Sequence, residues 1–273
     1  MEKFSVSMCV YGGDHPAWFQ TSVDSIRNQT APPDEIVLVV DGPVPEDLNA
    51  VICQYEKEPI FHVIRLEKNM GHGEARRISL NACKHSLVAL MDADDISVPD
   101  RFAKQIKMFA EDPALTIVGG NITEFVDTPD NLVGMRTVYT TDSEIKQDMK
   151  KRCPMNQMTV MFRKADVEAA GGYVDWYCDE DYYLWLRLML SGAKFCNIPE
   201  TLVNVRVGKE MYSRRGGMKY FKSEAKLQKW MLKKKVIGFG TYAVNVAKRL
   251  IVQVLLPNSL RSWVFQKFAR KSV

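Results

Sequence analysis

The chain has few of the features that mark secreted, disulfide-bonded or membrane-spanning proteins. Its six cysteines, in 273 residues, form no CxxC pair and no other metal-ligand spacing, so we expect reduced thiols. Residues 1–10 contain neither the basic region nor the long apolar core of a signal peptide. These absences favour a cytoplasmic protein and argue against secretion.

Acidic residues are nearly absent from the last quarter of the chain. From residue 201 onward 17 Lys and Arg stand against two acids, Glu210 and Glu224, a balance of +15; because the whole chain carries +4, residues 1–200 carry −11. A segment this basic suits nucleic acid, anionic lipid or a phosphorylated ligand. The overall composition, 46% apolar and 26% charged, is typical of a globular protein with one large α/β domain, or a core domain plus an appendage.

The most distinctive segment is a group of three carboxylates within residues 92–95, directly after the apolar run 87–91. Like charges crowded at the end of a buried strand are costly unless a cation binds there. The alternative is a solvated turn in which Asp95 or Ser97 caps a helix over residues 100–110. The cluster alone does not decide between a cation site and a helix cap.

Strand-like and helix-like segments alternate through the first part of the chain. The expected strands are 5–11, 35–40, 61–66 and 87–91, and the expected helices are 18–28, 47–55 and 73–85. This alternation predicts a parallel sheet with helices on both faces. In such sheets the ligand site lies beyond the carboxyl ends of the strands.

Each of these four strands is followed by a loop rich in Gly, Asn or Asp. The loops are 11–13, 41–42, 69–73 and 92–95. Such residues permit tight turns and a close approach of the backbone to a ligand. A single loop of this kind is usually only a turn, but four at one sheet edge favour a nucleotide or phosphate site over a helix cap.

The pattern is less regular between residues 121 and 165, where the polar stretch 127–143 is predicted to be loop and edge strand. A helix is expected from residue 178. It would place Asp181, Trp185 and Leu188 on one face, so that the carboxylate lies over the site and the two apolar side chains are buried. The alternative is that the acids of residues 179–181 only complement the positive end of the helix.

In this order the motifs resemble those of the family 2 glycosyltransferases. The matching segments span most of the first 220 residues: 5–11, 25–26 with 29–30, 35–42, Asn69 with Gly71 and Ala75-Arg76, 92–95, 171–173, and Glu180-Asp181 followed by 184–187. The resemblance implies a GT-A fold, with a Rossmann-like, mostly parallel central sheet flanked by helices. Segments 205–207 and 213–217 resemble the branch that adds single sugars to bacterial exopolysaccharide or O-antigen repeat units.

The resemblance also implies a donor site. Asp92-Ala93-Asp94 matches the DxD motif, with Asp94 as metal ligand and Asp92 as ribose contact and further metal ligand. Carboxylate oxygens suit Mg²⁺ or Mn²⁺, which would neutralise charge on the departing diphosphate. The remaining donor contacts expected from the resemblance are Val10 and Tyr11 at the base pocket, Asp41 on uracil, and Gly71 and Arg76 on the nucleotide.

For the chemistry, Asp181 matches the catalytic base of inverting members and is paired with Glu180. A carboxylate within hydrogen-bond reach must accept the proton of the acceptor hydroxyl as it attacks the anomeric carbon.

The chain lacks the QxxRW box of processive synthases, which indicates transfer of one sugar per acceptor. All four histidines lie in the first third, so the late metal-binding His of some GT-A enzymes has no counterpart; His72, in a site loop, either touches ligand or is a plain loop residue.

The basic C-terminal extension suggests a membrane partner. Arg214 and Arg215 are expected to form a cationic lid over a diphosphate. Apolar residues recur at helical spacing over 244–255, interrupted by Lys248 and Arg249, which argues against a membrane span and for a helix on an anionic membrane surface. The alternative is an amphipathic helix packed on the core. No nucleic-acid motif accompanies the basic residues, so lipid is preferred to nucleic acid.

Together these features predict a glycosyltransferase domain over 1–215, with a nucleotide-sugar half at about 1–125 and an acceptor half at about 126–215, and a basic, partly amphipathic helical tail over 216–273. The predicted enzyme moves one sugar from a nucleotide sugar, UDP-linked, to a polyprenyl-diphosphate-linked saccharide, on the cytoplasmic face of the membrane. A sugar-phosphate nucleotidyltransferase is the enzyme alternative, although residues 12–16 lack its basic residue. A non-catalytic sugar-binding module is the other.

Overall fold

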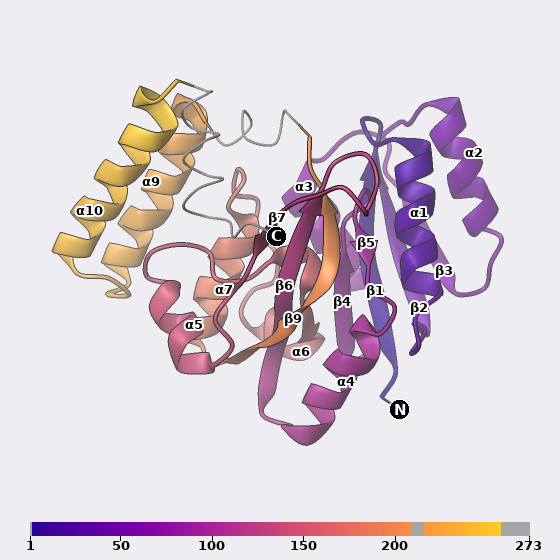
Figure 1. The fold of residues 1–273 in the computed structure, drawn as a ribbon, viewed down its shortest axis with the longest axis horizontal. Coiled ribbons are helices and arrows are strands. Elements are labelled where there is room, and N and C mark those ends of the chain that lie inside the picture. Colours follow the sequence, from indigo (N-terminus) through magenta and orange to yellow (C-terminus); the bar gives the residue numbers. More distant parts are fainter. Residues whose placement is uncertain (1, 209–215, 258–273) are drawn as a thin grey trace.

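A computed structural model describes residues 2–208 and 216–257, which build one large mixed sheet with helices on both faces (Figure 1). The described strands form a nine-stranded sheet in the order β3-β2-β1-β4-β8-β6-β9-β5, with β7 paired to β6. The strands are β1 (Phe4–Tyr11), β2 (Glu35–Asp41), β3 (Phe61–Arg65), β4 (Leu87–Met91), β5 (Ile96–Ser97), β6 (Leu115–Phe125), β7 (Leu132–Arg136), β8 (Met161–Arg163) and β9 (Lys194–Arg206).

The first four strands are parallel, as their alternation with helices predicts. Strand β1 lies between β2 and β4, and Tyr11 pairs with Asp41 at the shared carboxyl edge. The intervening helices are α1 (Pro16–Arg27), α2 (Glu46–Tyr55) and α3 (His72–Ala82). In α1 the expected inward residues, Val23 and Ile26, are fully buried. The predicted boundaries of these elements agree with the structure to within about three residues.

The second half of the sheet is mixed in direction. Strand β8 is antiparallel to both β4 and β6, whereas β6 and β9 are parallel and make the longest pairing in the sheet. Although the sequence pattern becomes less regular after residue 121, strand β6 continues to Phe125. Its polar residues Asn121, Thr123 and Glu124 are buried between β7 and β9, so the strand does not show the apolar run of a buried strand. The expected edge strand within 127–143 is β7.

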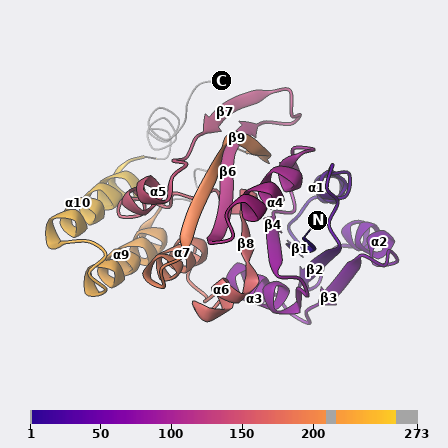
Figure 2. The same ribbon diagram turned by 90° about the horizontal axis from the view of Figure 1, so that it is seen from below.

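Helices cover the two faces of the sheet in separate groups. Figure 2 shows α1 and α4 (Arg101–Glu111) on one side of the strands and α3 and α6 (Lys164–Ala169) on the other. Two buried apolar clusters correspond to these two faces. The second cluster also receives α5 (Asp142–Asp148) and α7 (Glu180–Leu190), and the expected inward residues Trp185 and Leu188 of α7 are fully buried there.

Two antiparallel helices follow the sheet, namely α9 (Met218–Lys233) and α10 (Phe239–Leu250). They lie on the side of the molecule opposite to α2 (Figure 1). A short π-helix, η2 (Ile251–Leu255), continues α10. Helix α9 buries Leu227 and Met231 in the second core cluster. Within the described residues no helix has both the length and the apolar character needed to cross a membrane.

Candidate active site

A cleft of about 790 Å³ lies at the carboxyl ends of β1, β2 and β4. This is the edge at which the sequence predicts the ligand site, and it arises because parallel strands end together. The cleft brings together residues from the loops after all four parallel strands. Its lining residues are Cys9, Val10, Tyr11, Gly13, Asp14, His15, Trp18, Asp41, Asn69, Gly71, His72, Ala75, Asp92, Ala93 and Asp94.

Asp41 anchors the loop that follows β3. Its Oδ1 accepts a hydrogen bond from the Met70 amide at 2.6 Å, and its Oδ2 accepts one from the Gly71 amide at 3.1 Å. Gly42 next to it has a φ of +88°, and a Cβ there would lie 2.5 Å from the amide nitrogen of Asn69. Glycine is therefore required for the β2 and β3 loops to approach this closely. Asp41 and Gly71, expected as donor contacts, lie together in the cleft.

Asp92 is held by a buried arginine. The Arg76 side chain is 1% exposed, and one of its terminal nitrogens donates to Asp92 Oδ1 at 2.5 Å. Burial works against the charge of the guanidinium, but the Asp92 carboxylate keeps the pKa of Arg76 above its usual range. The described contacts of Arg76 are thus with protein groups, and its predicted contact with the nucleotide stays a prediction.

The two other acids of the cluster have different surroundings. Asp94 lines the cleft, whereas Asp95 is 2% exposed and its Oδ1 accepts the backbone amide of Arg206 at 2.9 Å. Burial, together with the charges of Asp94 and Asp92, raises the pKa of Asp95 well above its usual value. Asp95 and Ser97 do not cap the following helix, because α4 begins after Asp100 and Ser97 lies in β5.

Arg206 closes this side of the acid cluster from the end of β9. Its Nε donates to the Asp94 carbonyl at 3.2 Å, and its guanidinium lies 4.7 Å from the ring centroids of both Trp18 and Phe125. Burial lowers the pKa of Arg206, against the raising effect of Asp94 and Asp95. The sequence contains Arg206 in a motif, but nothing in its spacing places it here.

The donor set of the cleft fits a divalent cation completed by a substrate. Asp92 and Asp94 supply carboxylate oxygens on one wall of the cleft. In the part of the chain that the structure describes, no three His, Cys, Asp or Glu side chains form a complete metal site. Mg²⁺ is typically bound through one or two carboxylates together with substrate phosphates, which is the arrangement that these two aspartates allow.

Glu180 and Asp181 begin α7 and do not line the cleft, but Glu180 is joined to the cleft residue His72. The Nδ1 atom of His72 lies 2.9 Å from Glu180 Oε1, and the Nε2 atom of His72 lies 2.9 Å from the Arg76 Nε. Burial opposes the ionisation of Glu180, but the hydrogen bond from His72 and the charge of Arg76 help to outweigh it and lower the pKa of Glu180. The structure therefore links Asp92, Arg76, His72 and Glu180 in one hydrogen-bonded chain.

Asp181 is the other half of the acid pair. Its Oδ1 accepts the amide of Tyr182 at 2.6 Å, and the thiol of Cys153 is 3.9 Å from its Oδ2. Burial and the charge of Glu180 raise the pKa of Asp181 to about 6. A carboxylate with this pKa is largely ionised at neutral pH and is a better proton acceptor than an ordinary aspartate.

Several cleft residues were not singled out for the site from the sequence. Asp14, in the loop after β1, accepts the Tyr11 amide at 2.9 Å. Burial raises its pKa to about 6, with contributions from Asp94 and Asp92. His15 and Trp18 stack at 4.9 Å between ring centroids on the same wall. The indication available in the sequence was their position in and just after the first Gly-rich loop.

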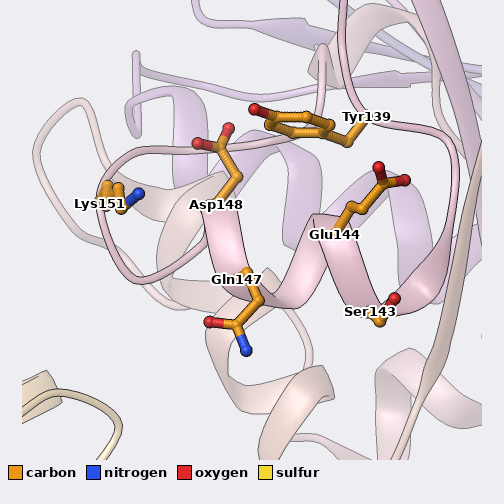
Figure 3. A pocket seen from close by; sticks show the side chains of 6 residues that line it. All are labelled: Tyr139, Ser143, Glu144, Gln147, Asp148 and Lys151. Atoms are coloured by element: carbon orange, nitrogen blue, oxygen red, sulfur yellow. The ribbon is translucent and has the colours of Figure 1, made fainter.

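Two expected site residues, Arg214 and Arg215, lie outside the described residues. A second hollow, of about 260 Å³, lies over α5 (Figure 3). None of the residues predicted for the site lines it. The larger cleft is therefore the candidate active site. The lining of the smaller hollow is Tyr139, Ser143, Glu144, Gln147, Asp148 and Lys151.

Two family models match the chain. "Glycosyl transferase family 2" matches residues 5–168, which is more than half of the chain, and "Glycosyl transferase family group 2" matches residues 87–265. The first match contains the whole acid cluster and the four parallel strands. The second also includes Glu180 and Asp181.

Curated relatives match over nearly the full length. An uncharacterized glycosyltransferase of Haemophilus influenzae is 39% identical, covering 98% of this chain and 100% of the relative. The Escherichia coli UDP-Gal:alpha-D-GlcNAc-diphosphoundecaprenol beta-1,3-galactosyltransferase is 35% identical, covering 98% and 97%. The amylovoran biosynthesis glycosyltransferase AmsE of Erwinia amylovora is also 35% identical, covering 97% and 98%. The relatives are therefore glycosyltransferases, with polysaccharide biosynthesis among their functions.

Solved structures show the same fold. Residues 1–349 of Staphylococcus aureus TarS superpose with a TM-score of 0.64 at 16% identity, covering 96% of this chain and 74% of that one. The same TarS fragment in complex with UDP gives a TM-score of 0.61 at 14% identity, covering 97% and 78%. The predicted GT-A fold is thus confirmed. With the family matches and the full-length relatives, these findings lead to one conclusion: the chain belongs to glycosyl transferase family 2 and is a glycosyltransferase.

Proposed function

We propose that this enzyme transfers a single sugar from a UDP-sugar to a lipid-diphosphate-linked saccharide, with inversion at the anomeric carbon. The observation that carries the proposal is the cleft at the strand ends, which is lined by Asp92 and Asp94 and is joined by His72 to Glu180, the residue next to Asp181. The site therefore offers groups for a diphosphate leaving group and, separately, a carboxylate base. A glycosyl transfer with a single displacement needs both.

The donor end of the proposal rests on the cleft and on a neighbour. Val10 and Tyr11 lie beside Asp41 at the carboxyl edge of β1 and β2, where they would line the base pocket. A structural neighbour of the same fold has been solved with UDP. A divalent ion held by Asp92 and Asp94 would supply positive charge next to the diphosphate as the leaving group departs.

Asp181 is the proposed base. The acceptor hydroxyl attacks the anomeric carbon while Asp181 accepts its proton, a bond forms between the acceptor oxygen and that carbon, and the bond from the carbon to the UDP oxygen breaks. One displacement of this kind inverts the anomeric configuration. Glu180 keeps its charge beside Asp181, which raises the basicity of Asp181.

The acceptor proposed here follows the chemistry that one relative's name states. A 35% identical enzyme transfers galactose to GlcNAc-diphosphoundecaprenol, so a short lipid-diphosphate-GlcNAc is the first acceptor to test. The assay measures transfer from UDP-, GDP- and dTDP-sugars, each with Mn²⁺, with Mg²⁺ or with EDTA. We expect transfer only from a UDP-sugar and only with metal, and NMR of the product to show the inverted anomer. Transfer unaffected by EDTA, or retention of configuration, would contradict the proposal.

The surface of the C-terminal helix pair, α9 and α10, supports the proposal that the enzyme binds its lipid-linked acceptor at an anionic membrane. Helix α10 packs through polar groups: Asn245 Nδ2 donates to the Lys150 carbonyl and to Gln228 Oε1, both at 2.9 Å. Arg249 pairs with Glu224 of α9. Five large apolar residues of α10 and η2 are exposed, together with Thr241 and Lys248: Phe239, Val244, Leu250, Ile251 and Leu255.

An amphipathic helix packed on a core would bury its large apolar side chains. Phe239 is 73% exposed and Leu255 is 65% exposed. The adjacent residues Lys233, Lys234 and Lys235 are exposed as well. A helix lies on a membrane surface when its apolar side chains insert into the lipid and nearby cations are attracted to anionic headgroups. Each cation adds about 1 kcal/mol of attraction.

Vesicle sedimentation tests this surface. We expect the wild-type protein to bind vesicles that contain phosphatidylglycerol and to bind phosphatidylcholine vesicles much less. Phe239→Asp with Ile251→Asp should abolish binding, while Val133→Asp, at an exposed apolar residue of β7, should not. Equal binding by the double variant and the wild type would show that α10 is not the contact.

A further inference from the structure

Helix α3 begins with a histidine, His72, whose two ring nitrogens are both engaged. Arg76 Nε lies 2.9 Å from His72 Nε2, and His72 Nδ1 lies 2.9 Å from Glu180 Oε1. Glu180 is 108 residues away in the sequence and is 7% exposed. The His72 side chain is 53% exposed and lines the donor cleft.

The directions of these hydrogen bonds follow from the groups involved. A guanidinium has only donors, so the Arg76 Nε–H donates and His72 Nε2 must accept. An imidazole that accepts at Nε2 is neutral and carries its proton on Nδ1. That proton points to Glu180 Oε1, which accepts as a carboxylate. The arginine therefore fixes the tautomer of His72, and His72 fixes both the rotamer and the ionised state of Glu180.

The same arginine holds the other end of the chain. Arg76 donates to Asp92 Oδ1 through a terminal nitrogen, so one buried guanidinium orients both the acid expected at the donor and, through His72, the acid beside the proposed base. A buried charge-assisted pair of this kind is geometrically restrictive. Its removal would release Glu180 and with it the charge that acts on Asp181.

We propose that His72 is a positioning residue that couples the donor-binding carboxylate Asp92 to the Glu180-Asp181 pair. This inference rests on the proposed function, since it assumes that Asp181 is the base. His72 does not itself exchange a proton with the acceptor. It holds Glu180 in the one arrangement in which Glu180 is ionised and turned away from the acceptor, so that Asp181 alone receives the proton.

Two substitutions separate this role from the alternatives. His72→Gln keeps an acceptor for Arg76 and a donor for Glu180 in one amide, whereas His72→Leu keeps neither. We expect His72→Leu to lower kcat by about 100-fold, as misplacement of a catalytic group does. The KM for the UDP-sugar and the affinity for UDP should change less than about threefold, and His72→Gln should recover most of kcat. His62→Leu, at an exposed histidine of β3, is the matched control and should behave as the wild type.

Three outcomes would overturn the proposal. Wild-type kcat in His72→Leu shows that the link is not used. Equal losses in His72→Gln and His72→Leu show that the imidazole acts otherwise, and a loss confined to UDP affinity shows a direct contact with the donor. Failure of the proposed function is seen separately, as normal transfer by Asp181→Asn in the same assay.

The tautomer gives a test that does not depend on activity. In the wild-type protein labelled with ¹⁵N-histidine, the His72 signals are those missing from the spectrum of His72→Gln. At neutral pH we expect a protonated Nδ1 and an unprotonated Nε2. A proton on Nε2 is incompatible with the bond from Arg76 and would overturn the inference.

Discussion

The pH dependence of transfer tests the assignment of Asp181 as base. Burial and the neighbouring Glu180 charge raise the pKa of Asp181 to about 6. The base must be ionised to accept a proton, so activity should rise with pH through this value. With a pKa of about 6, the ionised fraction at pH 5 is about tenfold lower than at pH 7, and kcat/KM should fall by about the same factor.

The substitution Asp181→Asn removes the base and keeps the size of the side chain. We expect a loss of about 100- to 10,000-fold in kcat/KM, the range for removal of a general base. The residual activity should lack the step, that is, the rise of kcat/KM with pH near pH 6. The measurement is the initial rate of sugar transfer from the active UDP-sugar between about pH 5 and pH 8, at saturating metal.

Asp14, a carboxylate that lines the cleft, provides the critical control. Burial also raises the pKa of Asp14 to about 6, so a step near this pH has two possible sources. We expect Asp14→Asn to retain the step. A step that disappears in Asp14→Asn, or one that persists in the residual activity of Asp181→Asn, would refute the reasoning. Transfer by Asp181→Asn at the wild-type rate would remove the residue as base altogether.

Three further predictions concern the metal, the buried Asp179 at the start of α7 and the β2 loop. Asp94→Asn should raise the Mn²⁺ concentration needed for half-maximal transfer by at least about tenfold; an unchanged metal titration would contradict its role. Burial, with Glu224 and Asp181, raises the pKa of Asp179 to about 9, so the unfolded state loses this proton at lower pH and the residue costs stability increasingly from about pH 4 to pH 9. Asp179→Asn should therefore raise Tm by an amount that grows over that interval, and a gain independent of pH would show that ionisation is not the cause. Gly42→Ala places a Cβ against Asn69 in a left-handed conformation, so it should cost at least about 1–2 kcal/mol in unfolding free energy and weaken UDP binding; unchanged Tm and affinity would show that the loop adjusts freely.

The donor half of the fold was predictable because its determinants are local. Each of the first four strands is a short, largely apolar segment followed by a loop rich in Gly, Asn or Asp, and the helices between them show helical periodicity. The direction of those strands follows from the alternation itself. Once they are parallel, the residues after them must meet at one edge, which is why Asp41, Gly71 and Asp92 lie together in the cleft.

The second half could not be read in the same way. Strand β6 carries buried polar residues such as Asn121 and Glu124, whose burial comes from strands β7 and β9 on either side. Its polar sequence looks exposed when read alone. The antiparallel direction of β8 likewise depends on its two neighbours and not on its three residues, Met161–Arg163.

What the sequence by itself determined is the α/β class, the acid cluster at the end of a parallel strand and the pairing of Glu180 with Asp181 at a helix start. Only the tertiary structure decided where each acid lies and what it contacts. It buries Asp95 against the Arg206 backbone, leaves Asp94 in the cleft, and brings His72 to Glu180 across 108 residues. It also buries Asn245 of α10 and leaves Phe239 and Val244 of the same helix exposed. Hydrophobic periodicity indicates which side chains face the core. The partners of each side chain depend on how distant elements pack, and this packing is fixed only when the chain folds.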